Sequence, residues 1–308
     1  MKRILCLLLC VILLCGCTAP VADPTDETTT APTEIVEGLS SLCDGKTLKI
    51  LAIGNSFSNN TTQYLYDVAA AEGITDITLG RLYIGGCALD RHARNIKNDS
   101  LEYTYYRNTT GSWETVENAT LQYGLLDHDW DIITMQQSSG KSGQPATYDV
   151  VLQEVIDYVN ANKTNSNAKL VWHMTWAYQG DSTHKDFAVY ANSQDVMYKC
   201  IVDANKQKIL TNDAFSAVIP AGTAIQNART SYLGDNLTAD GYHLNELGKI
   251  IATYTWYATL VEKTLDTVHL DKIPGSIPLD ENLKNVIVES VNNALKDPFQ
   301  VTQSAYID

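Results

Sequence analysis

The chain has 308 residues, of which 44% are hydrophobic, and its formal net charge is −14 at pH 7. This length is sufficient for one large α/β domain in addition to a leader segment. Phosphate binding requires clustered Lys and Arg side chains, so the acidic balance argues against nucleic acid as a partner.

The N-terminal segment is typical of an exported bacterial protein. Two basic residues precede an apolar run over residues 4–14, which is too short to span a bilayer because a spanning helix takes about 20 residues. The run ends in Leu14-Cys15-Gly16-Cys17, which resembles the bacterial lipobox. We therefore predict a lipoprotein signal peptide over residues 1–16 and a lipid anchor on Cys17; cleavage after Gly16 without lipidation is the alternative.

Residues 17–45 are rich in Thr, Pro, Asp and Glu and contain few side chains that could pack. Such a stretch buries too little apolar surface to order itself, so we predict a disordered tether that spaces the folded part roughly 25–30 Å from the membrane. The expected localisation is extracytoplasmic, on the bacterial cell membrane. Residues 46–264 are expected to form the main domain, and residues 265–308 a C-terminal extension whose helix near Asn282–Leu295 packs on it.

Short β-branched runs alternate with longer amphipathic stretches along the main domain. Strands are predicted at Leu48–Ile53, Ile77–Ile84, Asp131–Met135, Lys169–Met174 and Lys208–Leu210. Helices are predicted at Thr61–Glu72, Tyr148–Asn160, Ala188–Asn205 and Leu244–Val261. This alternation predicts a doubly wound, three-layer α/β/α fold around a mostly parallel sheet, with sites at the carboxyl ends of the strands. The Tyr- and Thr-rich segment Leu101–Val116 is expected to be a β-hairpin insertion.

Ser56 follows the first predicted strand directly, in the segment Leu51-Ala52-Ile53-Gly54-Asn55-Ser56-Phe57-Ser58. This places a hydroxyl at the first turn of a helix, where the N–H groups are unpaired and the helix dipole is positive. The serine's own N–H could then stabilise the oxyanion formed by its attack on an ester. The segment predicts a nucleophile at Ser56; the alternative is that Ser56 or Ser58 only caps the helix.

Asp240 and His243 supply a carboxylate and an imidazole three residues apart, the groups that a nucleophilic serine requires as orienting acid and base. Two other pairs have the same spacing, Asp181/His184 and Asp266/His269. Asp240 follows a polar loop, Gly241 permits a sharp turn, and a long helix is predicted directly after His243. We therefore choose Asp240 and His243; the rival pairs are expected in solvated loops.

These motifs resemble the SGNH (GDSL-like) hydrolase superfamily, and more closely a poorly characterised family of SGNH-like bacterial lipoproteins. The resemblance spans roughly residues 47–260 and rests on Gly-Asn-Ser-Phe near the start and Asp-Gly-Tyr-His-Leu near the end. It implies an SGNH/flavodoxin-like fold in which Ser56 is the nucleophile and Asp240 and His243 complete the triad. Asn55 stands where the commonest form of the first block has Asp.

The middle blocks of the superfamily match less closely. Its second block gives an oxyanion donor at a backbone glycine, which implies Gly86 rather than Gly85. Its third block normally carries Gly-x-Asn-Asp, whereas this chain has Gln136 and Gln137 at the end of the third strand, as in some acetyl-esterase branches. The resemblance implies Gln136 as the third donor, with Gln137 in reserve and as a substrate contact; a polar strand end is the alternative for both. Trp176 is expected either to stack on a sugar ring or to belong to the core.

We predict no metal and no cofactor. Apart from Cys17, the mature chain retains Cys43, Cys87 and Cys200, which are far apart and lack the paired spacing of a zinc site. One disulfide among these three cysteines is possible, and the sequence does not say which two would form it.

The resemblance implies a serine esterase, and most specifically one that removes O-acetyl groups from carbohydrate. The expected partners are an acylated carbohydrate or another ester substrate, and the membrane through the N-terminal lipid. The alternative is a catalytically inactive, glycan-binding surface lipoprotein of the same fold, which the missing third-block Asn would favour.

Overall fold

The computed structural model describes Leu39 and residues 45–275, 277–278 and 280–308. The predicted signal peptide, Cys17, Cys43 and all of the predicted tether except Leu39 and Gly45 lie outside these residues. Within them, no helix is both long and apolar enough to cross a membrane.

A seven-stranded sheet forms the middle of the described domain, in the order β4-β3-β2-β1-β5-β6-β7. The parallel strands are β1 (Thr47–Gly54), β2 (Asp76–Tyr83), β5 (Ile132–Met135), β6 (Lys169–His173) and β7 (Phe215–Ile219). The hairpin strands β3 (Tyr103–Asn108) and β4 (Trp113–Ala119) pair antiparallel and extend the sheet beyond β2. The predicted hairpin is therefore confirmed, as a continuation of the central sheet.

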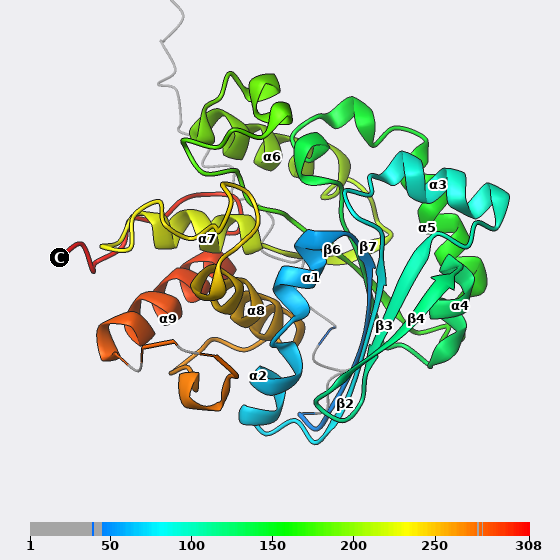
Figure 1. Ribbon diagram of the computed structural model, residues 1–308, viewed down its shortest axis with the longest axis horizontal. Coiled ribbons are helices and arrows are strands. Elements are labelled where there is room, and N and C mark those ends of the chain that lie inside the picture. Colours follow the sequence, from blue (N-terminus) through cyan, green and yellow to red (C-terminus); the bar gives the residue numbers. More distant parts are fainter. Residues whose placement is uncertain (1–38, 40–44, 276, 279) are drawn as a thin grey trace, which may run out of the picture. The chain divides into compact units, whose positions relative to one another are not determined.

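Helices cover both faces of the sheet (Figure 1). One group comprises α1 (Ser56–Thr62), α2 (Leu65–Ala71), α7 (Ala221–Arg229), α8 (Glu246–Leu260) and α9 (Glu281–Lys296), which contact one another around α8. The other face carries α3 (Leu89–Asn98), α4 (Leu121–Asp127) and α5 (Val151–Asn162), and α6 (Gln194–Lys208) lies near the carboxyl ends of the strands. The predicted doubly wound α/β/α class is confirmed, and the predicted C-terminal helix packs through buried Leu283, Ile287 and Val291.

Two predicted elements differ from the structure. The predicted strand Lys208–Leu210 is wrong because α6 continues to Lys208, and the N–H groups of Ile209 and Leu210 both bond to the Asn205 carbonyl. The edge strand follows later, at Phe215–Ile219. The single helix predicted over residues 61–72 is instead two short helices, and α3, α4 and α7 were not predicted.

Candidate active site

The nucleophile candidate is placed by a strand that turns directly into a helix. Ser56 is the first residue of α1, and Asn55 is the residue that caps it: its Oδ1 accepts the Phe57 N–H at 3.0 Å. The Ser58 hydroxyl donates to the Asn55 carbonyl at 2.8 Å. Since Asn55 performs the capping, neither serine is needed for it, and the Ser56 side chain is left to contact His243.

His243 joins the serine and the carboxylate across the carboxyl edge of the sheet. Its Nε2 lies 2.8 Å from Ser56 Oγ, and its Nδ1 lies 2.7 Å from Asp240 Oδ2. The other carboxylate oxygen, Asp240 Oδ1, accepts the N–H groups of His243 at 2.8 Å and Tyr242 at 3.2 Å. The turn depends on Gly241, which has a φ of +88° and where a Cβ would come within 3.1 Å of the Ser182 backbone. Ser56, His243 and Asp240 thus form one continuous hydrogen-bonded row.

The Asp240 carboxylate stays open to water, with 44% of its side chain exposed. Partial burial would raise its pKa, but the hydrogen bonds from His243 and from the backbone hold it below its ordinary value. An ionised Asp240 is the form that accepts all three of these bonds and stabilises a protonated imidazole.

The two rival carboxylate–imidazole pairs are not assembled in the described chain. Asp181 accepts a bond from Gln179, and His184 Nδ1 accepts the Asp186 N–H at 3.2 Å. His269 faces Glu72, with His269 Nε2 3.8 Å from Glu72 Oε1, rather than Asp266. Among these three pairs in the described residues, only His243 brings its imidazole ring to a serine hydroxyl.

Two backbone N–H groups are available near Ser56. The Ser56 N–H is at the free end of α1, and Gly86 lies in an exposed turn at the end of β2 with a φ of +61°. Neither N–H has an acceptor among the described residues. Gly86 precedes Cys87, whose carbonyl is held by Asn55 Nδ2 at 2.9 Å. This bond connects the glycine turn to the cap of α1.

The side-chain amides of Gln136 and Gln137 make hydrogen bonds within the protein, whereas the sequence predicted that one of them donates to the substrate oxyanion. Gln136 is 1% exposed and its Nε2 donates to Asn55 Oδ1 at 2.9 Å, while its Oε1 lies 2.9 Å from His173 Nδ1. Gln137 is fully buried; its Nε2 donates to Thr147, and its Oε1 accepts the N–H groups of Leu89 and Ser138. Because their amides are bonded inside the protein, Gln136 supports Asn55 and Gln137 connects two loops.

Trp176 belongs to the core. None of its surface is exposed, its ring stacks on Phe57 with centroids 4.2 Å apart, and its Nε1 donates to the Tyr242 carbonyl at 2.8 Å. A ring so placed cannot stack on a sugar. It instead supports the segment that carries His243.

Sequence reasoning missed two asparagines that position the site. Asn55 was noted only as a departure from the family pattern, yet it caps α1 and connects Gln136 to Cys87. Asn60 Oδ1 accepts the Leu244 N–H at 2.9 Å and so connects α1 to the residue after His243. An Asn between a strand and a helix is a recognisable sequence signal for a helix cap, so the role of Asn55 could have been found. The Asn60 contact gives no such signal, because it joins positions that are far apart in the sequence.

The described residues contain no cluster of three or more His, Cys, Asp or Glu side chains that could hold a metal ion. Cys87 is buried and Cys200 is partly buried, and both are free thiols. Burial raises the pKa of Cys87 to about 12, which keeps this thiol protonated beside the site.

Comparison with known proteins identifies one family. The model of a family described as a domain of unknown function, DUF4886, matches residues 49–272. A crystal structure of a DUF4886 family protein from Bacteroides uniformis ATCC 8492 is similar with a TM-score of 0.78 and 36% identity, over 85% of this chain and 100% of that chain. No curated protein sequence matches this chain.

Two further solved structures are more remote. A putative SGNH hydrolase from Slackia heliotrinireducens has 19% identity and a TM-score of 0.47, over 70% of this chain and 100% of that one. A catalytic mutant of Axe2, an acetylxylan esterase from Geobacillus stearothermophilus, has 8% identity and a TM-score of 0.44, over 70% of this chain and 95% of that one.

Proposed function

The chain belongs to the DUF4886 family, and from that premise we propose that it is a serine ester hydrolase with Ser56 as nucleophile, His243 as base and Asp240 as the orienting acid. The predicted relationship to a poorly characterised SGNH-like family agrees with this membership. The observation that carries the proposal is the row of contacts from Ser56 Oγ through both nitrogens of His243 to Asp240 Oδ2.

In the proposed reaction, His243 Nε2 takes the Ser56 proton while Oγ attacks the carbonyl carbon of the ester. The N–H groups of Ser56 and Gly86 stabilise the negative oxygen of the tetrahedral intermediate. Collapse breaks the bond to the leaving oxygen, which receives the proton from His243, and leaves an acyl group on Ser56. Water then attacks this acyl-enzyme with the same proton transfers, releasing the acid and restoring the serine.

A fluorophosphonate probe separates this enzyme from an inactive glycan-binding module of the same fold. The proposal expects covalent labelling of the wild-type protein and none of a Ser56→Ala variant. Asp181→Asn, which changes a rival carboxylate outside the row, is the matched control and should label normally. A folded wild-type protein that binds glycans but resists the probe would support the binding module instead.

We also propose an O-acetylated carbohydrate as the substrate class. Support comes from half-buried aromatic side chains near the glycine turn. Tyr83 lies beside this turn, since its hydroxyl is 3.3 Å from the position that a Cβ on Gly85 would occupy. Tyr106 lies next to it, with the two ring centroids 6.2 Å apart. In the hairpin, Trp113 is also half-buried, and the Arg81 guanidinium of β2 covers one face of its ring at 3.9 Å from the centroid. Such rings offer flat apolar surface with polar edges, which suits sugar rings. Measuring acetate release from a panel of acetylated glycans tests this class; activity confined to simple fatty esters would contradict it.

Membrane attachment through Cys17 is part of the same proposal and rests on the sequence of the leader. Fractionation of the bacterial membrane tests it. The wild-type protein should sediment with the membrane and a Cys17→Ser variant should not; equal recovery of both in the soluble fraction would contradict the anchor.

A further inference from the structure

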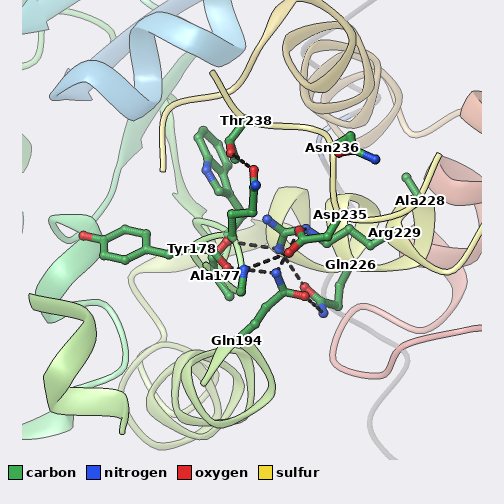
Figure 2. Close-up of polar contacts among 12 residues, drawn as sticks. Ala177, Tyr178, Gln194, Gln226, Ala228, Arg229, Asp235, Asn236 and Thr238 are labelled. Carbon is green, nitrogen blue, oxygen red and sulfur yellow. Dashed lines mark hydrogen bonds and ion pairs between the residues drawn. The ribbon is translucent and has the colours of Figure 1, made fainter. Parts of the chain in front are cut away.

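Arg229, the last residue of α7, carries a buried charge at the centre of a network of polar contacts (Figure 2). Only 4% of its side chain is exposed, and burial lowers its pKa to about 10 against the opposing effect of Asp235. Nε lies 2.8 Å from Asp235 Oδ1, and Nη1 donates to the Ala177 carbonyl at 3.1 Å and to Gln226 Oε1 at 3.0 Å. A buried guanidinium is costly unless it is paired, so Arg229 and Asp235 depend on each other.

Asp235 connects three segments that are far apart in the sequence. Besides Arg229, its Oδ2 accepts the Gly180 N–H at 2.7 Å and its Oδ1 accepts Gln194 Nε2 at 2.9 Å. The same Gln194 Nε2 donates to the Tyr178 carbonyl at 3.0 Å. Figure 2 shows Gln194 and Gln226 meeting around this ion pair. The carboxylate thus fixes the end of α7, the start of α6 and the backbone at residues 177–180 relative to one another.

The fixed backbone in turn holds the turn that carries the proposed acid and base. The Gln179 N–H donates to the Gly241 carbonyl at 2.8 Å, and the Gln179 side chain accepts a bond from Thr238. Gly241 lies between Asp240 and Tyr242, and Asp235 is five residues before Asp240 in the chain. A shift of residues 177–180 would therefore move the turn in which Asp240 orients His243.

We propose that Arg229 and Asp235 are positioning residues for His243: their buried ion pair fixes the 232–245 segment so that the imidazole meets the Ser56 hydroxyl. Neither side chain hydrogen bonds to Ser56, His243 or Asp240 among the described residues, so any effect on the reaction acts through geometry. This inference rests on the proposed esterase activity, because it assigns the ion pair a part in that activity.

The test compares Asp235→Asn and Arg229→Met with Asn227→Ala. Asn227 lies in the same helix, is 2% exposed, and holds Ser290 and Thr302 of the C-terminal region instead of the site. For the two ion-pair variants we expect kcat for p-nitrophenyl acetate to fall about 10–100-fold with little change in KM, since a displacement near 1 Å can cost that much. Asn227→Ala should lower the melting temperature and leave kcat unchanged well below it.

A second measurement separates positioning from general stability. The proton on His243 Nδ1, bonded to Asp240, should give a low-field NMR signal in the wild-type protein and in Asn227→Ala, and it should shift or broaden in Asp235→Asn. Arg229→Lys, which keeps the charge, should recover part of the lost kcat. Wild-type kcat and an unchanged His243 signal in Asp235→Asn would overturn the proposal. Failure of the wild-type protein to hydrolyse any ester would instead refute the proposed function.

Discussion

Ser56 is held by contacts within and next to its own strand–turn–helix unit, whereas His243 is held by segments from distant parts of the chain. On the nucleophile side, Asn55 caps α1 from the adjoining position, and Gln136 from the neighbouring strand supports that cap. On the side of His243, the 232–245 segment depends on residues 176–180 and on Arg229. The difference implies that adjoining residues determine the cap beside Ser56, while the position of His243 requires the whole domain to be assembled.

The largest expected effect is the loss of the proposed nucleophile, Ser56. Ser56→Ala should reduce ester hydrolysis by about 10⁵-fold or more, because the serine and its base act as a unit. The free energy of unfolding should change by no more than about 0.5 kcal/mol, since Asn55 rather than Ser56 caps α1. Steady-state kinetics and urea unfolding measure the two quantities. A large loss of stability with modest loss of activity would mean that Ser56 is structural.

Removing the charge of Asp240 should have the next largest effect. Asp240→Asn keeps the shape of the turn but removes the charge that orients and stabilises the His243 imidazolium, so kcat should fall about 10³–10⁴-fold. Because the pKa of Asp240 is lowered, its charge persists as the pH falls through the ordinary carboxyl range, and its contribution should be lost only below that range. Kinetics of the variant beside Asp181→Asn check the first expectation. Wild-type kcat in Asp240→Asn would exclude it as the orienting acid.

Replacing Asn55 tests whether the cap of α1 holds Ser56 in position. Asn55→Ala removes the cap, at about 1 kcal/mol, and leaves Gln136 Nε2 and the Cys87 carbonyl without their partner, at a further 1–3 kcal/mol or so. We expect kcat to fall roughly 10–100-fold as Ser56 and the Gly86 turn shift. Thr120→Ala removes the cap of α4, away from the site, and should cost stability alone. Equal kinetics for both variants would show that the cap does not position the nucleophile.

The last expected effect is on stability rather than on kcat, and it concerns acid and the two buried imidazoles. Burial lowers the pKa of His92 to about 4 and that of His173, under Gln136, to about 3, from an ordinary value of 6.5. Between pH 6.5 and 4 the unfolded chain binds protons on both histidines and the folded chain does not. Stability should therefore be fully present above that window and fall by up to about 1.4 kcal/mol per pH unit for each histidine as the pH is lowered.

Urea unfolding at a series of pH values measures this slope, and His92→Asn should halve it. An unfolding free energy that stays constant from pH 7 to pH 4 would contradict the neutral burial of these rings.

The sequence was informative where structure is local. The β1–α1 unit, the hairpin and the turn at Asp240 could be predicted because strand pattern, glycine and helix start are read from adjacent residues. The end of α6 was mistaken for a strand because Ile209 and Leu210 form an apolar run that is short enough to fit either element. The burial of Gln136, Gln137 and Trp176 could not be predicted, since a polar or aromatic strand end looks the same whether it faces a cleft or the core. The contacts of Arg229 and Asn60 join positions that only folding brings together.

The most direct test of the account is to trap the acyl-enzyme. The wild-type protein would be quenched in acid during turnover of p-nitrophenyl acetate, digested, and examined by mass spectrometry. The account predicts one acetyl group on the peptide that contains Ser56, located at that hydroxyl, and its absence from His243→Ala. Turnover with the acetyl group on another residue, or with no covalent adduct under conditions where deacylation is slow, would contradict it.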